Sequence, residues 1–170
     1  NLSITFDSAI TLGDLGEVRI YKESDDSIVD LLKVDRKKGA NVDVISAPDK
    51  TRSLNYTPIS IAEDGKTLNI DPCNDVLEYG ESYYVVISDD VVSGAQLNGI
   101  DFTGLGESSN WTFTTKFTAP SGSDILVDDD GVADFRTLQG ALSYVMNNVA
   151  KDDPATISVK DGIYNEMLYL

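Results

Sequence analysis

Histidine is absent from the 170-residue chain, and cysteine occurs once, at Cys73. Without histidine, these residues cannot form a Ser-His or Cys-His nucleophile pair or a histidine-ligated zinc site. With a single cysteine, they form no internal disulfide and no cysteine-based metal cage. No apolar run approaches the roughly 20 residues that a membrane-spanning helix needs. These absences exclude several large classes of enzyme site.

Positive charge is also scarce, because 13 lysines and arginines stand against 29 acidic residues, which gives a formal net charge of -16. Such a charge repels the phosphates of nucleic acids and the surface of anionic membranes. An apolar share of 41% is enough for a packed core. An acidic surface fits a soluble, secreted protein. Residues 1–6 already have a strand pattern and no signal peptide precedes them, so we expect a trimmed or mature fragment.

The first two thirds of the chain carry many short strand patterns. Apolar and polar residues alternate over residues 2–6 and 111–115, and residues 83–88 form the most strand-like run. Residues 63–66, Glu-Asp-Gly-Lys, have the composition of a tight hairpin turn. Short strands at close intervals without a helical period predict an all-β sandwich over residues 1–118.

Beyond residue 118 the pattern changes. Residues 119–123 are small, polar and turn-forming, which is typical of a linker. Residues 125–127 and 156–159 have strand patterns, and residues 138–149 have the apolar spacing of a helix with one buried stripe. Residues 167–170 begin a further strand. We therefore predict a second part over residues 124–170.

The first part resembles a bacterial Ig-like domain of the kind found in secreted, multimodular proteins. The resemblance rests on residues 4–6, the hairpin of residues 64–72, Leu77 with Gly80, and the strands at residues 83–87 and 111–115. It departs from the pattern by extra residues between Val34 and Pro58. The resemblance implies an Ig-like β-sandwich that acts as a spacer or supports a neighbouring catalytic unit, although some such domains bind ligands.

The second part resembles the opening of a pectinesterase, a right-handed parallel β-helix that removes methyl esters from pectin. The similar residues are Val127, Asp130-Gly131, Asp134-Phe135, the run 137–142 and the run 157–166. The resemblance implies that the first strand and the helix cap the open end of the β-helix, and that residues 124–170 hold only this cap and the first coil.

The catalytic groups of pectinesterases are two aspartates, an arginine and glutamines on later coils, and their motifs do not occur in this sequence. We therefore assign no catalytic residue. We expect a non-catalytic accessory region of a secreted bacterial pectinesterase-like protein, whose partner is the esterase β-helix.

A first coil alone leaves strand edges unpaired. Residues 156–170 are therefore expected to pack on the sandwich, to exchange with a second copy of the chain, or to fray.

Two groups of residues are candidates for ligand binding. Asp128, Asp129 and Asp130 could hold a structural calcium ion, which prefers clustered carboxylates, or could form a solvated acidic turn. A pectin-binding surface could combine basic residues of the segment 33–52 with tyrosines, because polygalacturonate is anionic and sugars stack on flat rings. The candidates are Lys33, Arg36, Lys37, Lys38, Lys50, Arg52, Tyr21, Tyr56, Tyr79 and Tyr84.

Each binding hypothesis has a structural alternative. The basic residues can also form an ordinary charged hairpin, paired with Asp30, Asp35, Asp43 and Asp49. Trp111 shares a strand face with Phe113, which predicts a place in the core. Tyr83 occupies a position similar to the tyrosine corner of β-sandwiches and is expected to be structural.

Overall fold

The structure is a computed structural model, which describes residues 2–35, 43–45, 51–53, 58–73, 76–164, 166 and 168. For residues 35, 43–45 and 51–53 it describes the backbone alone. The chain divides into two compact units, Asn1–Phe117 and Thr118–Leu170. Within the described ranges, no helix is both long and apolar enough to cross a membrane.

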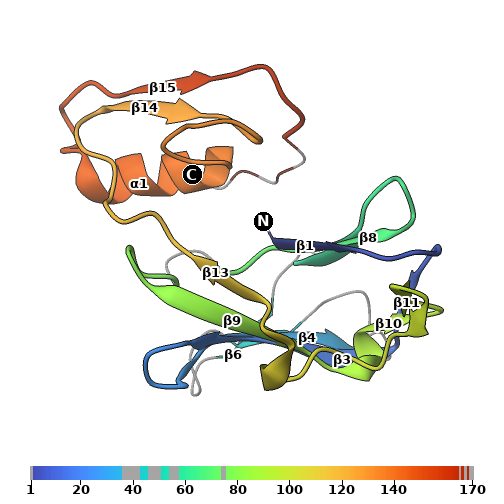
Figure 1. Cartoon of the computed structure of the whole chain (residues 1–170). Helices are drawn as coiled ribbons and strands as arrows, with labels where there is room; N and C mark the ends of the chain where they lie inside the picture. Colours follow the sequence, from blue (N-terminus) through green and yellow to red (C-terminus); the bar gives the residue numbers. More distant parts are fainter. Residues whose placement is uncertain are drawn as a thin grey trace. The chain divides into compact units, whose positions relative to one another are not determined.

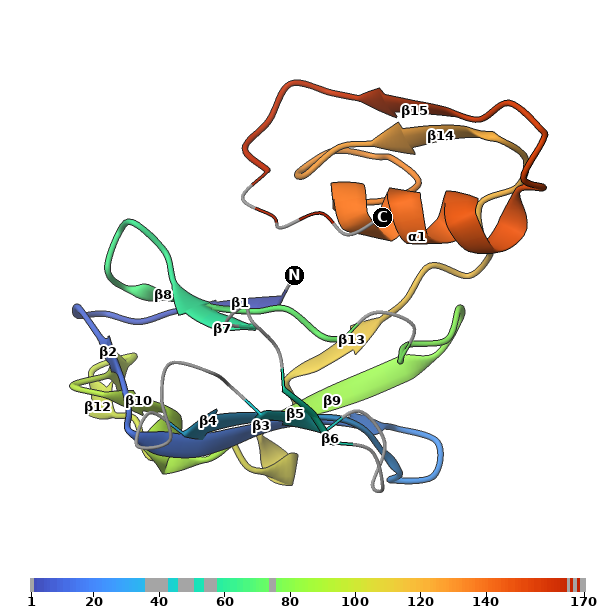
Figure 2. The same ribbon diagram turned by 180° about the vertical axis from the view of Figure 1, so that it is seen from behind.

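The first unit contains two antiparallel sheets that face each other as layers (Figures 1 and 2). The smaller sheet has the order β1-β8-β7, with β1 at Leu2–Thr5, β8 at Thr67–Ile70 and β7 at Ile59–Ile61. The larger sheet has the order β13-β9-β3-β4-β5-β6. Its strands are β3 (Leu15–Lys22), β4 (Ile28–Asp35), β5 (Asp43–Ile45), β6 (Thr51–Ser53), β9 (Ser82–Ile87) and β13 (Thr112–Thr114).

Shorter elements lie around these sheets. Strand β2 (Thr11–Leu12) pairs with β10 (Val92–Ser93), and β11 (Gln96–Leu97) pairs with β12 (Ile100–Asp101). Two short 3-10 helices, η2 (Asp89–Val91) and η3 (Glu107–Ser109), lie in the connection between β9 and β13.

The core of the first unit lies between the two sheets. Val18, Leu32 and Val85 point inward from the larger sheet, and Leu68 and Ile70 from the smaller one, each at most 1% exposed. Burying a side chain of this size stabilises the fold by about 1.5–3 kcal/mol. The inward residues alternate with outward ones, as the sequence pattern predicts, so the mainly β prediction is confirmed.

The predicted turn at residues 63–66 joins β7 to β8. The Asp64 carboxylate accepts hydrogen bonds from the backbone N–H groups of Lys66 at 2.8 Å and Thr67 at 2.9 Å. Gly65 has φ of 67°, a conformation that a residue without Cβ adopts at little cost. Aspartate and glycine therefore fix this hairpin, and with it the register of β8 against β7.

A buried carboxylate connects strand β4 to the segment that follows β8. Asp30 is fully buried, and its Oδ2 accepts a hydrogen bond from the backbone N–H of Cys73 at 2.7 Å. Its Oδ1 accepts one from the N–H of Leu31 at 3.0 Å. Burial raises the pKa of Asp30 above its ordinary value, against the opposite effect of these hydrogen bonds. The contact ties together elements of the two sheets.

Tyr83 has the structural role that the sequence predicts. Its side chain is fully buried, and its hydroxyl accepts a hydrogen bond from the backbone N–H of Glu78, five residues earlier, at 2.8 Å. Its ring stacks on Phe113 of the neighbouring strand, with centroids 5.4 Å apart.

The second unit contains a parallel pair of strands and one helix. Strands β14 (Asp124–Val127) and β15 (Thr156–Val159) pair in parallel, and helix α1 (Leu138–Asn148) lies between them in sequence (Figure 1). The helix packs its Ala141 against Ile125 and Val127 of β14. The predicted helix and both strands are present.

The helix begins at Thr137, whose Oγ1 accepts a hydrogen bond from the backbone N–H of Gly140 at 3.1 Å. Glu166 supplies a second cap, because its two carboxylate oxygens accept the N–H groups of Leu138 and Gln139 at 2.8 and 2.9 Å. Such caps satisfy amides that have no partner within the helix.

Residues 156–159 pair with β14 of their own unit, an arrangement that none of the three expected alternatives included. The strand predicted at residues 167–170 lies outside the described residues, except for Leu168, which is exposed.

Candidate functional site

Three of the predicted sugar-binding residues lie on the outer face of the larger sheet. Because Val18, Ile20, Leu32 and Val85 are buried in the unit, the residues that alternate with them point to the outside. The outer face is therefore formed by Glu17, Arg19 and Tyr21 of β3, Lys33 of β4 and Tyr84 of β9.

Tyr21 and Tyr84 are cross-strand neighbours on this face. Their rings are stacked, with centroids 4.9 Å apart and planes inclined by 5°. The Tyr84 hydroxyl donates a hydrogen bond to Oδ1 of Asp26 at 3.1 Å. Burial together with this bond raises the pKa of Tyr84 to about 12, so the phenol is neutral at physiological pH. Each ring gives one flat side to the other, which leaves at most one side of each for a ligand.

The charged residues of the outer face are paired with one another. Glu17 forms salt bridges with Arg19 and, at 3.1 Å, with Lys33. Burial opposes ionisation of Glu17, but the bonds from Lys33 and Arg19 outweigh it, so the pKa of Glu17 lies below its ordinary value. The Lys33 charge is thus compensated by Glu17. Of the aspartates that the sequence suggested as partners, Asp30 accepts the backbone amides of Leu31 and Cys73, and the side chains of Asp35, Asp43 and Asp49 lie outside what the structure describes.

The other sugar-binding candidates are not found on the part of this face that the structure describes. Tyr79 is 45% exposed in the segment before β9. The side chain of Arg52, on β6, lies outside what the structure describes. Arg36, Lys37, Lys38, Lys50 and Tyr56 also lie outside the described residues. The structure therefore brings Tyr21 and Tyr84 into contact and places Lys33 elsewhere on the same face.

The predicted calcium-binding residues are close together. One carboxylate oxygen from each of Asp128, Asp129 and Asp130 lies within 4.8 Å of the others. However, Oδ1 of Asp128 accepts the N–H of Gly131 at 2.9 Å, which lowers the pKa of Asp128, and Oδ2 of Asp129 accepts the N–H of Ile163 at 3.0 Å. Two of the three carboxylates therefore already bind backbone amides, which fits the alternative of an acidic turn.

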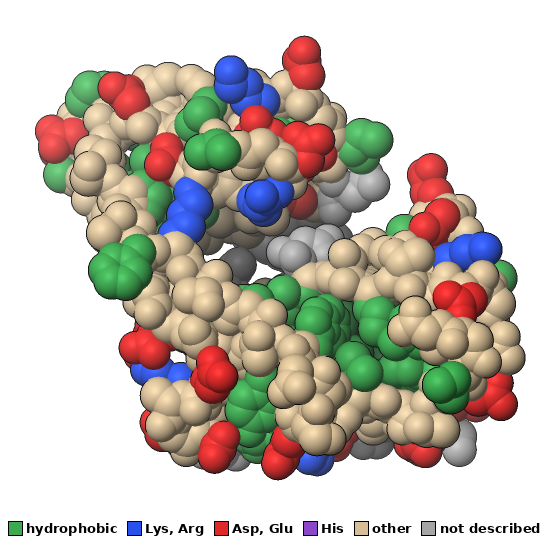
Figure 3. Space-filling model, viewed as in Figure 1, with side chains coloured by type: hydrophobic (Ala, Val, Ile, Leu, Met, Phe, Trp, Pro, Cys, Tyr) green, Lys and Arg blue, Asp and Glu red, His purple; other side chains and the backbone are tan. Residues whose placement is uncertain are grey.

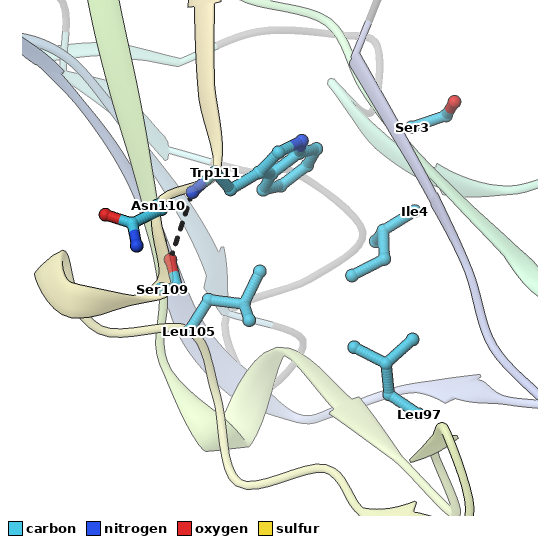
Figure 4. Close-up of a pocket in the computed structure, with 7 residues that line it drawn as sticks. All are labelled: Ser3, Ile4, Leu97, Leu105, Ser109, Asn110 and Trp111. Atoms are coloured by element: carbon cyan, nitrogen blue, oxygen red, sulfur yellow. Dashed lines mark hydrogen bonds between the residues drawn. The ribbon is translucent and has the colours of Figure 1, made fainter.

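A pocket opens between the two sheets beside Trp111 (Figure 4). Its volume is about 310 Å³, and apolar side chains gather at this opening in the space-filling view (Figure 3). It is lined by Ser3, Ile4, Leu97, Leu105, Ser109, Asn110 and Trp111. Trp111 packs against the core, as predicted, but the pocket itself was not predicted, because nothing local in the sequence places these segments together.

Comparison with known proteins identifies the first unit. A family model of the bacterial Ig-like domain matches residues 1–115. The chain belongs to this family. The Ig-like domain thus includes both sheets, the outer face and the Trp111 pocket, and the match ends before β14. No match to the chain is found among curated proteins or among solved structures. No pectinesterase family model matches, so the resemblance of residues 124–170 stays a prediction.

Proposed function

We propose that the chain is a non-catalytic accessory region of a secreted bacterial pectinesterase-like protein, in which the Ig-like domain is a spacer or support for the esterase β-helix. The observation that carries the proposal is the parallel pairing of β14 and β15 next to helix α1. Residues 124–170 thus combine a strand, a helix and a parallel strand, as expected for the capped start of a parallel β-helix.

The free side of this unit supports continuation into further coils. Within the described part of the unit, β15 pairs with β14 alone, which leaves its other edge without a strand. Val159, Ile163 and Leu168 are 46%, 78% and 48% exposed. Parallel sheets are normally buried on both faces, and solenoid repeats are stabilised by their neighbours. A following coil would cover both the edge and these apolar side chains.

Two observations support a non-catalytic role. The catalytic motifs of pectinesterases do not occur in the sequence. The pocket beside Trp111 is lined by residues without an ionisable side chain, so it offers no general acid, base or carboxylate nucleophile.

Methanol release from methyl-esterified pectin tests this role. We expect the chain to release no more methanol than buffer does, between pH 5 and pH 9 and with or without calcium. Methanol that rises in proportion to protein concentration and disappears after heat denaturation would show that these residues are an esterase, and would overturn the proposal.

A second candidate function is pectin binding by the outer face. The observation in its favour is that Tyr21, Tyr84 and Lys33, from three different strands, lie on the same outer face of the sheet, with the two tyrosines in contact. The compensation of Lys33 by Glu17 and the mutual stacking of the two rings weigh against it. We therefore place it second.

A further inference from the structure

The Ig-like domain has an open side between strand β1 and the start of strand β13. Each of these strands is the outermost member of its sheet. The pocket described above lies between them, with Ile4 on the β1 side and Trp111 on the β13 side (Figure 4).

The outer edge of β1 has backbone groups available for pairing. The N–H of Phe6 donates to the carbonyl of Lys66, on the β8 side, at 3.0 Å. Because peptide groups alternate along a strand, those of Ser3 and Thr5 point to the opposite edge. Strand β1 pairs with β8 alone among the described strands, so no strand covers Ser3 and Thr5 on that edge.

The same edge is already paired just beyond the end of β1. There the N–H of Asp7 donates to the carbonyl of Gln96, in β11, at 2.8 Å. A strand placed along Ser3 and Thr5 would therefore extend an existing line of backbone pairing. Strand β1 is short, with four residues, but it contains neither proline nor charge, and its register against β8 has no bulge, so these protections of an edge strand are missing.

The pocket fits one large apolar side chain. Its volume of about 310 Å³ is at the lower end of the roughly 300–1,000 Å³ that is typical of small-molecule sites. Its lining contains Ile4, Leu97, Leu105 and Trp111, and none of its residues is charged, although the chain as a whole carries a net charge of -16. The pocket therefore favours an uncharged, apolar side chain of the bound molecule.

Acidic residues lie beside one end of this neutral centre. Asp7 directly follows the strand that contains Ser3 and Ile4, and its carboxylate accepts the N–H of Gly99. Asp101 accepts a hydrogen bond from the side chain of Gln96, whose carbonyl accepts the N–H of Asp7. Both acidic side chains are exposed, so a basic residue would complement them at the end of an occupant that lies near Asp7.

We propose that the β1 edge and the Trp111 pocket bind an extended strand of a partner polypeptide. The strand pairs with the backbone of Ser3 and Thr5, places one bulky apolar side chain in the pocket, and carries lysine or arginine at the end that lies near Asp7. Main-chain hydrogen bonds give affinity in this mode of binding, and the pocket gives specificity. This site is separate from the outer face and does not depend on the proposed accessory role.

Fluorescence of the intact chain tests the proposal directly, because Trp111 is its single tryptophan. The probe is the peptide Lys-Thr-Val-Thr-Leu-Thr-Val-Thr-Lys, which contains no tryptophan. We expect a saturable shift of the Trp111 emission. Two control peptides carry N-methyl groups on the odd or on the even backbone nitrogens. Because only one edge of the peptide faces β1, one control is expected to bind and the other to fail.

A pair of variants locates the contact. Ser3→Pro removes an N–H that points away from β8, so the sheet is retained but pairing at the outer edge is lost. We expect an unchanged unfolding temperature and an affinity for the peptide that is lowered by up to about tenfold. Ser3→Ala keeps the N–H and is expected to bind like the original chain.

Several results would overturn the proposal. They are the absence of any shift at millimolar peptide, equal binding of both methylated peptides, and full binding by Ser3→Pro. Sedimentation of the chain without peptide tests whether a second copy of the chain occupies the β1 edge instead. A dimer that Ser3→Pro converts to a monomer would show that a second copy of the chain, rather than a partner strand, occupies the edge.

Discussion

Glu166 and Leu138 are joined by a hydrogen bond that spans 28 residues of sequence, from the backbone N–H of Leu138 to Oε1 of Glu166 at 2.8 Å. The second oxygen of Glu166 binds the N–H of Gln139. A negative charge at this end of a helix is also stabilised by the helix dipole. The contact joins the two separate stretches that carry the pectinesterase resemblance, residues 137–142 and 157–166.

We predict that Glu166→Gln destabilises the unit of residues 118–170 by about 1–3 kcal/mol, because one acceptor and the negative charge are lost. Hydrogen exchange measures this loss through faster exchange of the Leu138 and Gln139 amides. The matched control is Glu107→Gln, an exposed acidic residue of the Ig-like domain, which is expected to leave both amides unchanged. Equal exchange in Glu166→Gln and the original chain would show that the cap contributes nothing.

Asp30 provides a prediction for the Ig-like domain. Its two oxygens accept two backbone N–H groups, and an amide can replace only one of these acceptors. Asp30→Asn is therefore expected to lower the free energy of unfolding by about 1–3 kcal/mol. Urea unfolding, followed by the fluorescence of Trp111, measures the difference.

The effect of Asp30 on stability also depends on pH. Because burial raises the pKa of Asp30 in the folded state, the folded state binds its proton more tightly than the unfolded state does. The stabilisation that proton binding by Asp30 gives to the folded state is complete below the pKa of an unfolded aspartate. It declines as pH rises through the pKa of Asp30 in the folded state. The stability of the original chain relative to Asp30→Asn is thus expected to fall from pH 4 towards neutral pH. A difference that rises with pH would contradict the assigned direction.

The three neighbouring aspartates give a prediction about calcium. Since the carboxylates of Asp128 and Asp129 already bind backbone amides, we expect millimolar calcium to leave the unfolding temperature of residues 118–170 unchanged. A saturable increase that is lost in Asp130→Asn would instead identify a calcium site, because a ligand that binds only the folded state stabilises it. Magnesium at the same concentration controls for ionic strength.

Sequence patterns predicted the features that depend on neighbouring residues. The hairpin at Asp64 and Gly65 follows from local turn chemistry, and the helix that starts after Thr137 follows from its apolar spacing. The inward side chains of the strands follow from the alternation of apolar residues. These features need no knowledge of which strands are neighbours.

The features that sequence reasoning missed depend on sheet order. Asp30 meets Cys73 across 43 residues, and Tyr21 meets Tyr84 because β3 lies beside β9. Likewise, the pocket at Trp111 requires β1 and β13 to be edge strands on the same side of the domain. One sequence without related sequences contains no direct signal for such long-range neighbours.

Calorimetric titration of the chain with polygalacturonate and with methylated pectin, each with and without calcium, tests the central claim of a supporting role most directly. We predict no binding heat under any of the four conditions. Saturable heat that disappears in Tyr84→Ala, but not in Tyr79→Ala, would contradict the claim. That result would make the outer face of the Ig-like domain a pectin-binding site.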